Sequence, residues 1–226
     1  MATNLKSVRA VVFDAVGTLI HPDPPVSVAY KELGFQHGSQ LTREDIARNF
    51  HRVLLAFSHQ TTTDEEIELQ RWRQIVAGVF SDLEDTDRLF CELWDHFARP
   101  ASWSVNEDAA AALADLKLRG YQTAIGSNFD NRLLAIVPKL PPLNQVQEIF
   151  VSSQVGFAKP AVQFFRAIEV ELNLFPDELL MVGDDPANDI AGAAEAGWHS
   201  LLLNREHSAS VPDSIRSLRE IASRLP

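Results

Sequence analysis

The sequence predicts an α/β protein with a Rossmann-like parallel sheet, helices on both faces and an inserted all-helical domain. Two observations lead to this prediction. Over residues 106–203, short apolar runs alternate with helical segments, which is the pattern of a parallel sheet covered on both sides. Before that, residues 26–98 show only helical patterns, so a helical unit interrupts the sheet after its first strand.

The first strand is expected over residues 11–13. Val11, Val12 and Phe13 form a β-branched and aromatic run that is typical of a buried strand. Asp14 follows where the run stops, and Gly17-Thr18 supplies a tight turn. A carboxylate at the end of a buried strand lies where open α/β sheets bind ligands. An Asp that only begins a loop explains these residues equally well.

Residues 21–97 are expected to form the inserted domain, and residues 1–20 together with 98–226 the α/β domain. The insertion begins with residues 21–25 (HPDPP), which we interpret as a stiff, extended linker. A helical stretch of this size after one strand is typical of a second small domain.

Helices in the insertion are marked by apolar stripes. Thr42 with Asp45 and Thr63 with Glu66 resemble capping boxes, and apolar residues at helical spacing follow each pair. A third stripe ends at Phe97, and a shorter helix is expected from about Val26. We interpret these stripes as the core of a helix bundle and not as a cofactor-binding sequence.

The rest of the chain alternates between strands and helices. Asn106 is expected to cap the first of these helices, and Gly120 and Gly197 to end two of them. Strands are expected over residues 121–125, 149–152, 179–182 and 200–203, and helices over residues 106–117, 160–171 and 188–196.

Charge limits the possible partners. The 226 residues carry a formal net charge of −11, with 46% hydrophobic and 23% charged residues. Nucleic acids and anionic membrane surfaces both require basic protein surface, so we expect neither as a partner. A small molecule, including an anionic one held in a local cationic pocket, remains compatible with this charge. The sequence leaves the oligomeric state open.

The single cysteine, Cys91, rules out an internal disulfide and fits a reducing compartment. Because it lies among Leu89, Phe90 and Leu93, we expect it to pack in a core. No hydrophobic run is long enough to span a bilayer, and the N-terminal residues do not resemble a signal peptide. We therefore expect a cytoplasmic protein.

Polar residues follow several predicted strands directly. Asp14, Ser127 and Asp184 each come at the end of such a strand, and in a parallel sheet these ends share one edge. Lys159 precedes Pro160, which we interpret as the first residue of a helix. A lysine there faces the positive end of the helix dipole, which suggests a bound anion, although a solvated lysine is also possible.

Acidic residues are concentrated after the strand over residues 179–182. Asp184 and Asp185 are adjacent like charges, which favours a bound cation. Asp189 is weaker evidence, because an acid in the first turn of a helix stabilises that helix in any case. We interpret Asp130 as a helix-start residue for the same reason.

With these residues in place, the chain resembles the haloacid dehalogenase (HAD) superfamily of hydrolases. The matching motifs are FDAVGTL (13–19), GSN (126–128), KP (159–160) and GDDPANDIAGA (183–193), in that order along nearly the whole chain. The helical insertion resembles the C1-type cap of that superfamily. The DAVGTL motif (residues 14–19), together with Trp72-Arg73 in the cap, is most similar to the REG-2-like subgroup.

The resemblance implies a phosphatase that acts on a small phosphorylated molecule. Asp14 would be the nucleophile, and water would hydrolyse the resulting aspartyl-phosphate. Mg²⁺ would be held by Asp14, the backbone carbonyl of Val16 and Asp184, with Asp189 as a further or outer ligand. Ser127 and Lys159 would also be catalytic, and the cap would close over the site. The residues implied in phosphate binding are Gly17, Thr18, Ser127, Asn128 and Lys159.

Val16 departs from the phosphatase pattern. Phosphatases of the superfamily usually carry a second Asp at this position, as general acid and base, and valine cannot transfer a proton. Such help is typically worth roughly 10²–10⁴ in rate, so alkyl phosphates should be poor substrates. His21 or Asp23 could substitute, although both lie in the expected linker.

Three functions are therefore compared. The first is a Mg²⁺-dependent phosphatase, and the second is a non-catalytic protein that binds phosphate and metal with this fold. The third is a 2-haloacid dehalogenase, which this chain resembles at Asp14, Ser127, Asn128 and Lys159 and which also lacks the second Asp. We rank the dehalogenase last, because Asp184 and its acidic neighbour would repel a carboxylate substrate.

Overall fold

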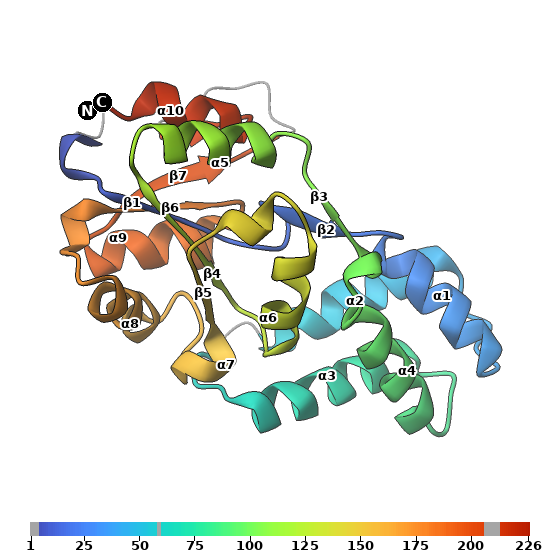
Figure 1. The fold of residues 1–226 in the computed structure, drawn as a ribbon. Helices are drawn as coiled ribbons and strands as arrows, with labels where there is room; N and C mark the ends of the chain where they lie inside the picture. The colour runs from blue at the N-terminus through green and yellow to red at the C-terminus, as the bar shows by residue number, and fades with distance from the viewer. Residues whose placement is uncertain (1–4, 58–59, 206–212) are drawn as a thin grey trace.

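The computed structural model describes residues 5–57, 60–205 and 213–226 and contains the predicted parallel sheet (Figure 1). Its strands are β1 (Ala10–Phe13), β4 (Gln122–Ser127), β5 (Glu148–Val151), β6 (Leu179–Gly183), β7 (His199–Leu203) and β8 (Ser214–Ile215). The sheet order is β5-β4-β1-β6-β7-β8, and every pairing is parallel. The first strand of the chain therefore lies between β4 and β6, inside the sheet.

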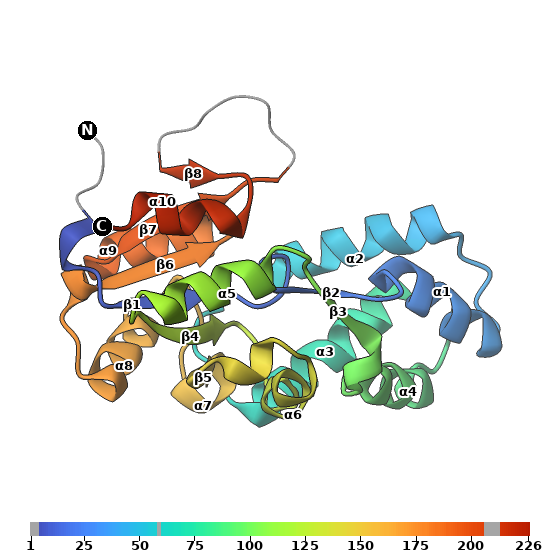
Figure 2. The same cartoon turned by 45° about the horizontal axis from the view of Figure 1, so that its top comes forward.

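Helices cover both faces of this sheet, as predicted (Figure 2). One face carries α5 (Ala109–Leu118), α6 (Arg132–Ile136) and α10 (Ile221–Arg224), and the other carries α8 (Val162–Leu172) and α9 (Gly192–Ala196). Strand β1 shows why both faces need cover. Val11 and Phe13 pack on the α5 side, Ala10 and Val12 pack on the α8 side, and all four are fully buried.

Short segments complete the α/β domain. They are η1 (Leu5–Ser7), η2 (Pro100–Ser102), η3 (Val137–Lys139), η4 (Leu143–Gln145), α7 (Ser152–Val155), η5 (Pro176–Glu178), the π-helical η6 (Pro186–Ala191) and η7 (Leu218–Glu220). Among the described residues, no helix has both the length and the apolar character needed to cross a membrane.

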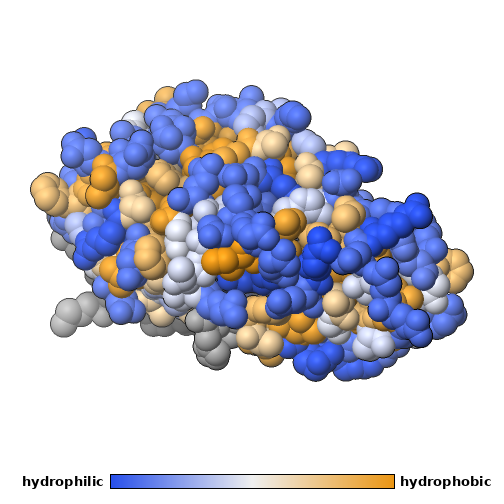
Figure 3. All heavy atoms as spheres, turned by 90° about the horizontal axis from the view of Figure 1, so that it is seen from below, coloured by the Kyte–Doolittle hydropathy of each residue, from blue (hydrophilic) through white to orange (hydrophobic). Residues whose placement is uncertain are grey.

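The insertion is helical, as expected, and has its own core. Its helices are α1 (Val26–Gln36), α2 (Arg43–Phe57), α3 (Glu65–Val79) and α4 (Asp87–Phe97). Tyr30 of α1 lies at the centre of that core, stacked on Phe80 and edge-on to Phe50. We refer to this helical unit as the cap. The face of the molecule in Figure 3 shows hydrophobic patches separated by hydrophilic residues, so that view offers no continuous apolar surface.

The expected linker at residues 21–25 is partly a strand. β2 (Ile20–Pro22) pairs antiparallel with β3 (Trp103–Val105), and this two-stranded ribbon joins the cap to the sheet domain. The sequence signal is weak because only three residues are involved and one of them is Pro22, which is tolerated at a strand edge.

Two predicted helix starts need correction, while Thr42 and Asp45 form the expected reciprocal capping bonds. Asp64 and not Thr63 caps α3, because its carboxylate accepts the Ile67 amide. Asn106 does not cap α5, which begins at Ala109. Its side chain instead donates to the Thr18 carbonyl, at 2.8 Å.

Cys91 is exposed, so the expectation that it packs in a core was wrong. Its neighbours Leu89, Phe90 and Leu93 are buried, as expected. An α-helix completes one turn in about 3.6 residues, so Cys91 lies on the side of α4 that faces away from Leu89 and Leu93.

Asp108 links the start of α5 to the C-terminal part of the chain by hydrogen bonds. Its carboxylate accepts hydrogen bonds from Arg205 (2.7 and 3.0 Å), the Ser217 hydroxyl (2.8 Å) and the Leu218 amide (2.9 Å). Burial opposes ionisation of this carboxyl, but these hydrogen bonds outweigh burial and lower the pKa of Asp108 to about 2.

Asp108→Asn is expected to lower the free energy of unfolding at pH 7 by about 2 kcal/mol. A folded-state pKa below the unfolded value of about 3.9 means that this contribution is present above about pH 4. It is lost as the pH falls towards about 2, so the difference between native and variant should shrink at pH 3. Urea unfolding at both pH values measures it. Asp115→Asn, which removes an exposed ion pair with Arg119 from the same helix, is the control. An equal loss in both variants would contradict the role of Asp108.

Candidate active site

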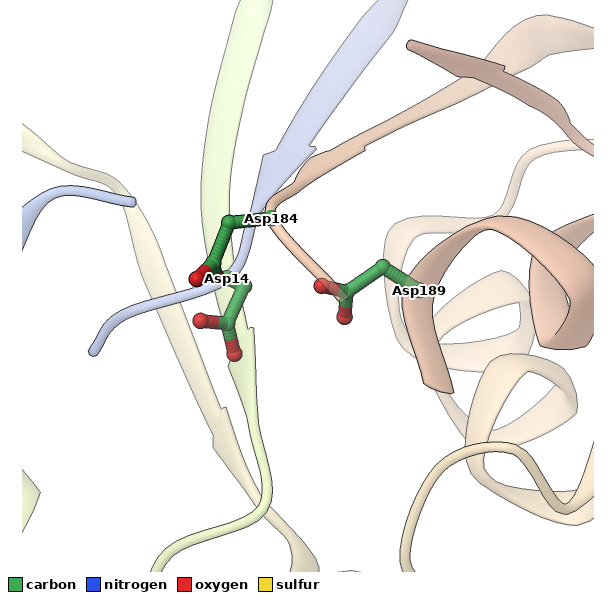
Figure 4. Close-up of side chains that lie close together, drawn as sticks. All are labelled: Asp14, Asp184 and Asp189. Atoms are coloured by element: carbon green, nitrogen blue, oxygen red, sulfur yellow. The ribbon is translucent and has the colours of Figure 1, made fainter. Parts of the chain in front are cut away.

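Three carboxylates meet at the carboxyl edge of the sheet. Asp14 follows β1, Asp184 follows the neighbouring β6, and Asp189 points towards both from η6 (Figure 4). One carboxylate oxygen from each lies within 4.8 Å of the others. Asp14 and Asp189 are buried, whereas Asp184 is exposed. The sheet thus brings together the three acidic side chains that were predicted as metal ligands.

Lys159 binds two of the three carboxylates of this cluster. Its Nζ donates to Asp14 Oδ1 (2.7 Å), Asp189 Oδ1 (2.6 Å) and the Gly126 carbonyl (2.8 Å). These three bonds use all the N–H groups of the ammonium. Burial disfavours the ammonium, but Asp14 and Asp189 outweigh burial and raise the pKa of Lys159.

The interpretation of Lys159 as a helix-start residue was wrong. Helix α8 begins at Val162, with Ala161 as its cap residue, so the lysine lies in the preceding loop and not at the helix dipole. The unusual position of Lys159 in the sequence did indicate a residue of the candidate site, but the reason was not a helix dipole. Lys159 is present because two buried carboxylates need a counter-charge, and no local pattern could reveal that.

The charges in this cluster do not balance. Three carboxylates face one ammonium. Burial raises the pKa of Asp14 to about 7, although the nearby charge of Lys159 opposes this and that of Asp189 adds to it. A divalent cation would supply the missing positive charge, and carboxylate oxygens are ligands that Mg²⁺ prefers. The donor set therefore fits Mg²⁺.

Two glycines make room for these acids. Gly17 has φ = +95°, and a Cβ there would collide with the Asp184 carboxylate. A Cβ on Gly183 would collide with the Asp189 carboxylate in the same way. Thr18 donates to Asp184 Oδ1 at 3.2 Å. The predicted turn at Gly17-Thr18 thus shapes the acidic cluster directly.

Ser127 and Asn128 lie at the end of β4, beside Asp14. The Ser127 hydroxyl donates to Asp14 Oδ1 at 3.3 Å. The Asn128 side chain accepts from the Lys159 amide (2.7 Å) and donates to the Lys159 carbonyl (2.9 Å). Asn128 therefore fixes the loop that carries the lysine.

Other polar residues singled out from the sequence lie outside the cluster. Asp185 caps η6 by accepting the Ala187 and Asn188 amides, so its negative charge is not directed at a cation site. Asp130 is more than a helix-start residue, because it forms a buried ion pair with Arg132 at 2.7 Å.

His21 and Asp23 both have partners near the β2–β3 ribbon. His21 Nδ1 lies 3.0 Å from Asn106 Oδ1, and Asp23 accepts the Ser104 hydroxyl at 2.8 Å. Neither side chain belongs to the acidic cluster of the described residues.

The sequence did not reveal a cavity of about 280 Å³ between the cap and this site. Val16 and Asn128 line it from the sheet domain, and Tyr30, Trp72 and Trp94 line it from the cap. Trp72 and Trp94 were interpreted only as bundle core, and Tyr30 was not singled out. Amphipathic spacing does not distinguish a face that is covered by protein from one that borders a cavity.

The cap contacts the loop that leads to Lys159. The Ala158 amide donates to the Thr61 carbonyl (2.7 Å), and the Thr63 amide donates to the Gly156 carbonyl (3.1 Å). The cap is therefore held against the candidate site by backbone hydrogen bonds as well as by the ribbon.

A parallel sheet interrupted by a helical cap after its first strand, with a buried Asp–Lys pair at the carboxyl edge, defines a hydrolase of the haloacid dehalogenase type. The chain belongs to the haloacid dehalogenase-like hydrolase family, whose model matches residues 8–197. The Rhythmically expressed gene 2 protein of Drosophila melanogaster is 27% identical over 91% of this chain and 86% of that protein. This match confirms the similarity to the REG-2-like subgroup.

Solved structures with different activities share the fold. An HAD phosphatase from Thermococcus onnurineus gives a TM-score of 0.69 at 20% identity. L-2-haloacid dehalogenase from Xanthobacter autotrophicus gives 0.75 at 19%, and the magnesium-bound HAD-hydrolase YfnB from Bacillus subtilis gives 0.74 at 21%. Each comparison covers 96% of this chain and 97% of the other. At these identities the likeness shows the fold alone, so the choice of reaction depends on the site.

Asp184→Asn is expected to weaken Mg²⁺ binding by about tenfold or more, because a charged oxygen ligand is replaced by a neutral one. Titration calorimetry measures the affinity. Asp185→Asn is the matched control, since asparagine still caps a helix and Asp185 lies outside the cluster. Unchanged affinity in Asp184→Asn would overturn the assignment of the metal site.

Proposed function

We propose that this hydrolase is a Mg²⁺-dependent phosphatase that transfers a phosphoryl group from a small molecule to Asp14 and then to water. The observation that carries the proposal is the unbalanced charge of the cluster, three carboxylates against one ammonium. Such a site suits a cation together with a substrate phosphate.

Asp14, Asp184 and the backbone carbonyl of Val16 would hold the metal ion, with Asp189 as a further or outer ligand. When bound, Mg²⁺ would neutralise charge on the substrate phosphate and on the carboxylates, which favours the ionised form of Asp14. This ionisation matters because only the carboxylate is a nucleophile, and the pKa of Asp14 is about 7 without a cation.

In the first step a carboxylate oxygen of Asp14 attacks phosphorus, and the bond from phosphorus to the leaving oxygen breaks. Ser127 and Lys159 hold Asp14 by its Oδ1 atom, which leaves Oδ2 available for attack. Water then attacks phosphorus of the aspartyl-phosphate, releases inorganic phosphate and restores the carboxylate. Lys159 contributes by holding charge at Asp14, and it contacts phosphate only if one of its three hydrogen bonds is exchanged.

The same site disfavours a dehalogenase. A 2-haloacid carries its own carboxylate, which would approach Asp184 and Asp189 as well as Asp14. Repulsion between like charges at such short range is unfavourable in a partly buried site. A phosphate ester meets the same repulsion unless a cation is present, which is why the proposal requires Mg²⁺.

Val16 limits which phosphate esters can react. Its side chain is partly exposed beside Asp14 and has no proton to give to the leaving oxygen. His21 and Asp23, the alternative donors, are hydrogen-bonded near the ribbon. The leaving group must therefore depart without a proton, which aryl oxides and carboxylates do far better than alkoxides.

Val16→Asp is expected to raise turnover of alkyl phosphates by about tenfold or more, within the range for an added general acid. The native protein should show a steep dependence of rate on leaving-group pKa, and the variant a shallower one. A Brønsted series of phosphate monoesters measures both slopes. Val16→Asn, similar in shape but unable to donate a carboxylic proton, is the control.

A shallow slope in the native protein would show that another residue, such as His21 or Asp23, already delivers the proton. Absence of turnover on every ester, with normal binding of Mg²⁺ and phosphate, would instead support the non-catalytic alternative.

A further inference from the structure

The cavity beside the acidic cluster has an unusual lining. It holds about 280 Å³, near the lower end of the roughly 300–1,000 Å³ of small-molecule pockets, which suits a group of one or two rings. Its walls are mainly apolar, and half of the residues that line it are aromatic. Three of the four tryptophans of the chain, Trp72, Trp94 and Trp103, border it, together with several phenylalanines such as Phe50 and Phe129.

The cavity reaches the site of phosphoryl transfer at two points. Val16 lies two residues after the nucleophile Asp14, and Asn128 directly follows Ser127. The leaving group of a phosphate held at Asp14 would therefore lie close to this part of the cavity wall. The residue that cannot act as a general acid is also part of the apolar wall.

The one cation in the lining is already paired. Arg132 forms a bidentate ion pair with Asp130, and its guanidinium lies 3.4 Å from the centre of the Trp94 ring. Among the described residues of the lining it is the only charged one. A leaving group with a second phosphate or a carboxylate would therefore find no free charge to bind.

Tyr30 supplies one unpartnered polar group. The residue is 2% exposed and borders the cavity, and no hydrogen bond of its hydroxyl is found among the described residues, although that hydroxyl is not one of their fully buried unpartnered atoms. Burial raises the pKa of this hydroxyl, so it remains a neutral donor and acceptor. The hydroxyl therefore keeps some accessible surface at the cavity, where it can form a hydrogen bond with a polar group on a bound ring.

We propose that the substrates are aryl phosphate monoesters whose ring lies in this cavity and carries a hydrogen-bonding group that meets the Tyr30 hydroxyl. The inference rests on the proposed phosphatase function. When Asp14 attacks phosphorus, the bond between phosphorus and the aryl oxygen breaks and the aryl oxide leaves with the electron pair. Solvent then protonates it. An aryl oxide needs no acid at Val16, so the chemistry and the cavity select the same class of substrate.

Ring binding can be measured without turnover by using phosphonates, in which the organic group is bonded directly to phosphorus and no P–O–C bond is present to be cleaved. With Mg²⁺ present, phenylphosphonate should bind the full-length protein about tenfold or more tightly than methylphosphonate, by titration calorimetry. The two ligands share the phosphonate head, so their difference reports the ring alone. Equal affinities would overturn the proposal.

Leu54→Trp fills the cavity from α2, at a position that is 37% exposed and can accept a larger side chain. It should remove the preference for phenylphosphonate and leave methylphosphonate binding unchanged. Leu55→Trp makes the same change one residue later, outside the lining, and should preserve the preference. A preference that survives in Leu54→Trp, with both variants folded by circular dichroism, would contradict the assignment of the cavity.

The role of Tyr30 is tested with the three isomers of hydroxyphenylphosphonate. The native protein should prefer one isomer, and Tyr30→Phe should remove that preference while it keeps the affinity for phenylphosphonate. If the isomer preference persists in Tyr30→Phe, the hydroxyl does not contact the ligand.

Turnover separates this inference from the proposed function. Hydrolysis of phenyl phosphate with a higher kcat/KM than acetyl phosphate supports both, because acetate is the better leaving group but has no ring. Hydrolysis of acetyl phosphate in preference to phenyl phosphate would overturn the aryl assignment and leave the phosphatase standing. If neither is hydrolysed while phenylphosphonate still binds preferentially, the phosphatase fails and the ring site stands.

Discussion

Asp14→Asn is expected to reduce hydrolysis of phosphate monoesters by about 10⁴-fold or more, since an amide cannot form the phosphoryl intermediate. The side chain keeps its size, so the fold should persist. Initial rates with an aryl phosphate and Mg²⁺ measure the loss. A second measurement gives the reason: mass spectrometry of native protein quenched during turnover should find one phosphoryl group on Asp14, and none in the variant.

The matched change Asp115→Asn provides a control. Asp115 forms an exposed ion pair with Arg119 and lies outside the acidic cluster, so its loss should leave the rate nearly unchanged. Full activity in Asp14→Asn would contradict the proposed mechanism, because every step of it passes through that carboxylate.

Lys159→Met should destabilise the metal-free protein by about 3 kcal/mol, because it leaves Asp14 and Asp189 buried without a counter-charge. Interpreted as a helix-start residue, the lysine would cost little or nothing to remove. Its buried position reverses that expectation. Urea unfolding at pH 7 without metal measures the difference, and added Mg²⁺ should restore part of the stability to a variant that still binds it.

Lys139→Met makes the same substitution at an exposed position and should change stability little. A similar small effect in Lys159→Met would mean that the two carboxyls are protonated in the folded protein. In that case the charge argument for a cation at this edge would fail.

The sequence alone determined the architecture and the group of polar residues at the carboxyl edge of the sheet. Alternating apolar runs and helices predicted the parallel sheet, and the helical stretch predicted the cap. Because parallel strands end at one edge, Asp14, Ser127 and Asp184 could be placed together without any coordinates. These predictions succeeded because each rests on a repeated local pattern and on one general rule of topology.

Only the tertiary structure decided how individual side chains are used. Asp185 and Asp189 are both aspartates, and the sequence gives no reason to treat them differently. In the structure Asp185 caps η6, whereas Asp189 accepts a hydrogen bond from Lys159. Lys159 itself pairs with Asp14 across 145 residues of chain. Capping rules describe neighbours in sequence, so they cannot report a counter-charge that comes from a loop distant in the sequence.

The cavity shows the same limit. Tyr30 and Trp94 have the spacing of core residues, and in the cap they are core residues. Both residues also line the cavity beside Val16. This depends on how the cap packs on the sheet domain, to which it is joined by the β2–β3 ribbon and the hydrogen bond between Thr61 and Ala158. Periodicity specifies which face of a helix is apolar, and only the packing of one domain on the other decides whether that face meets protein or a ligand.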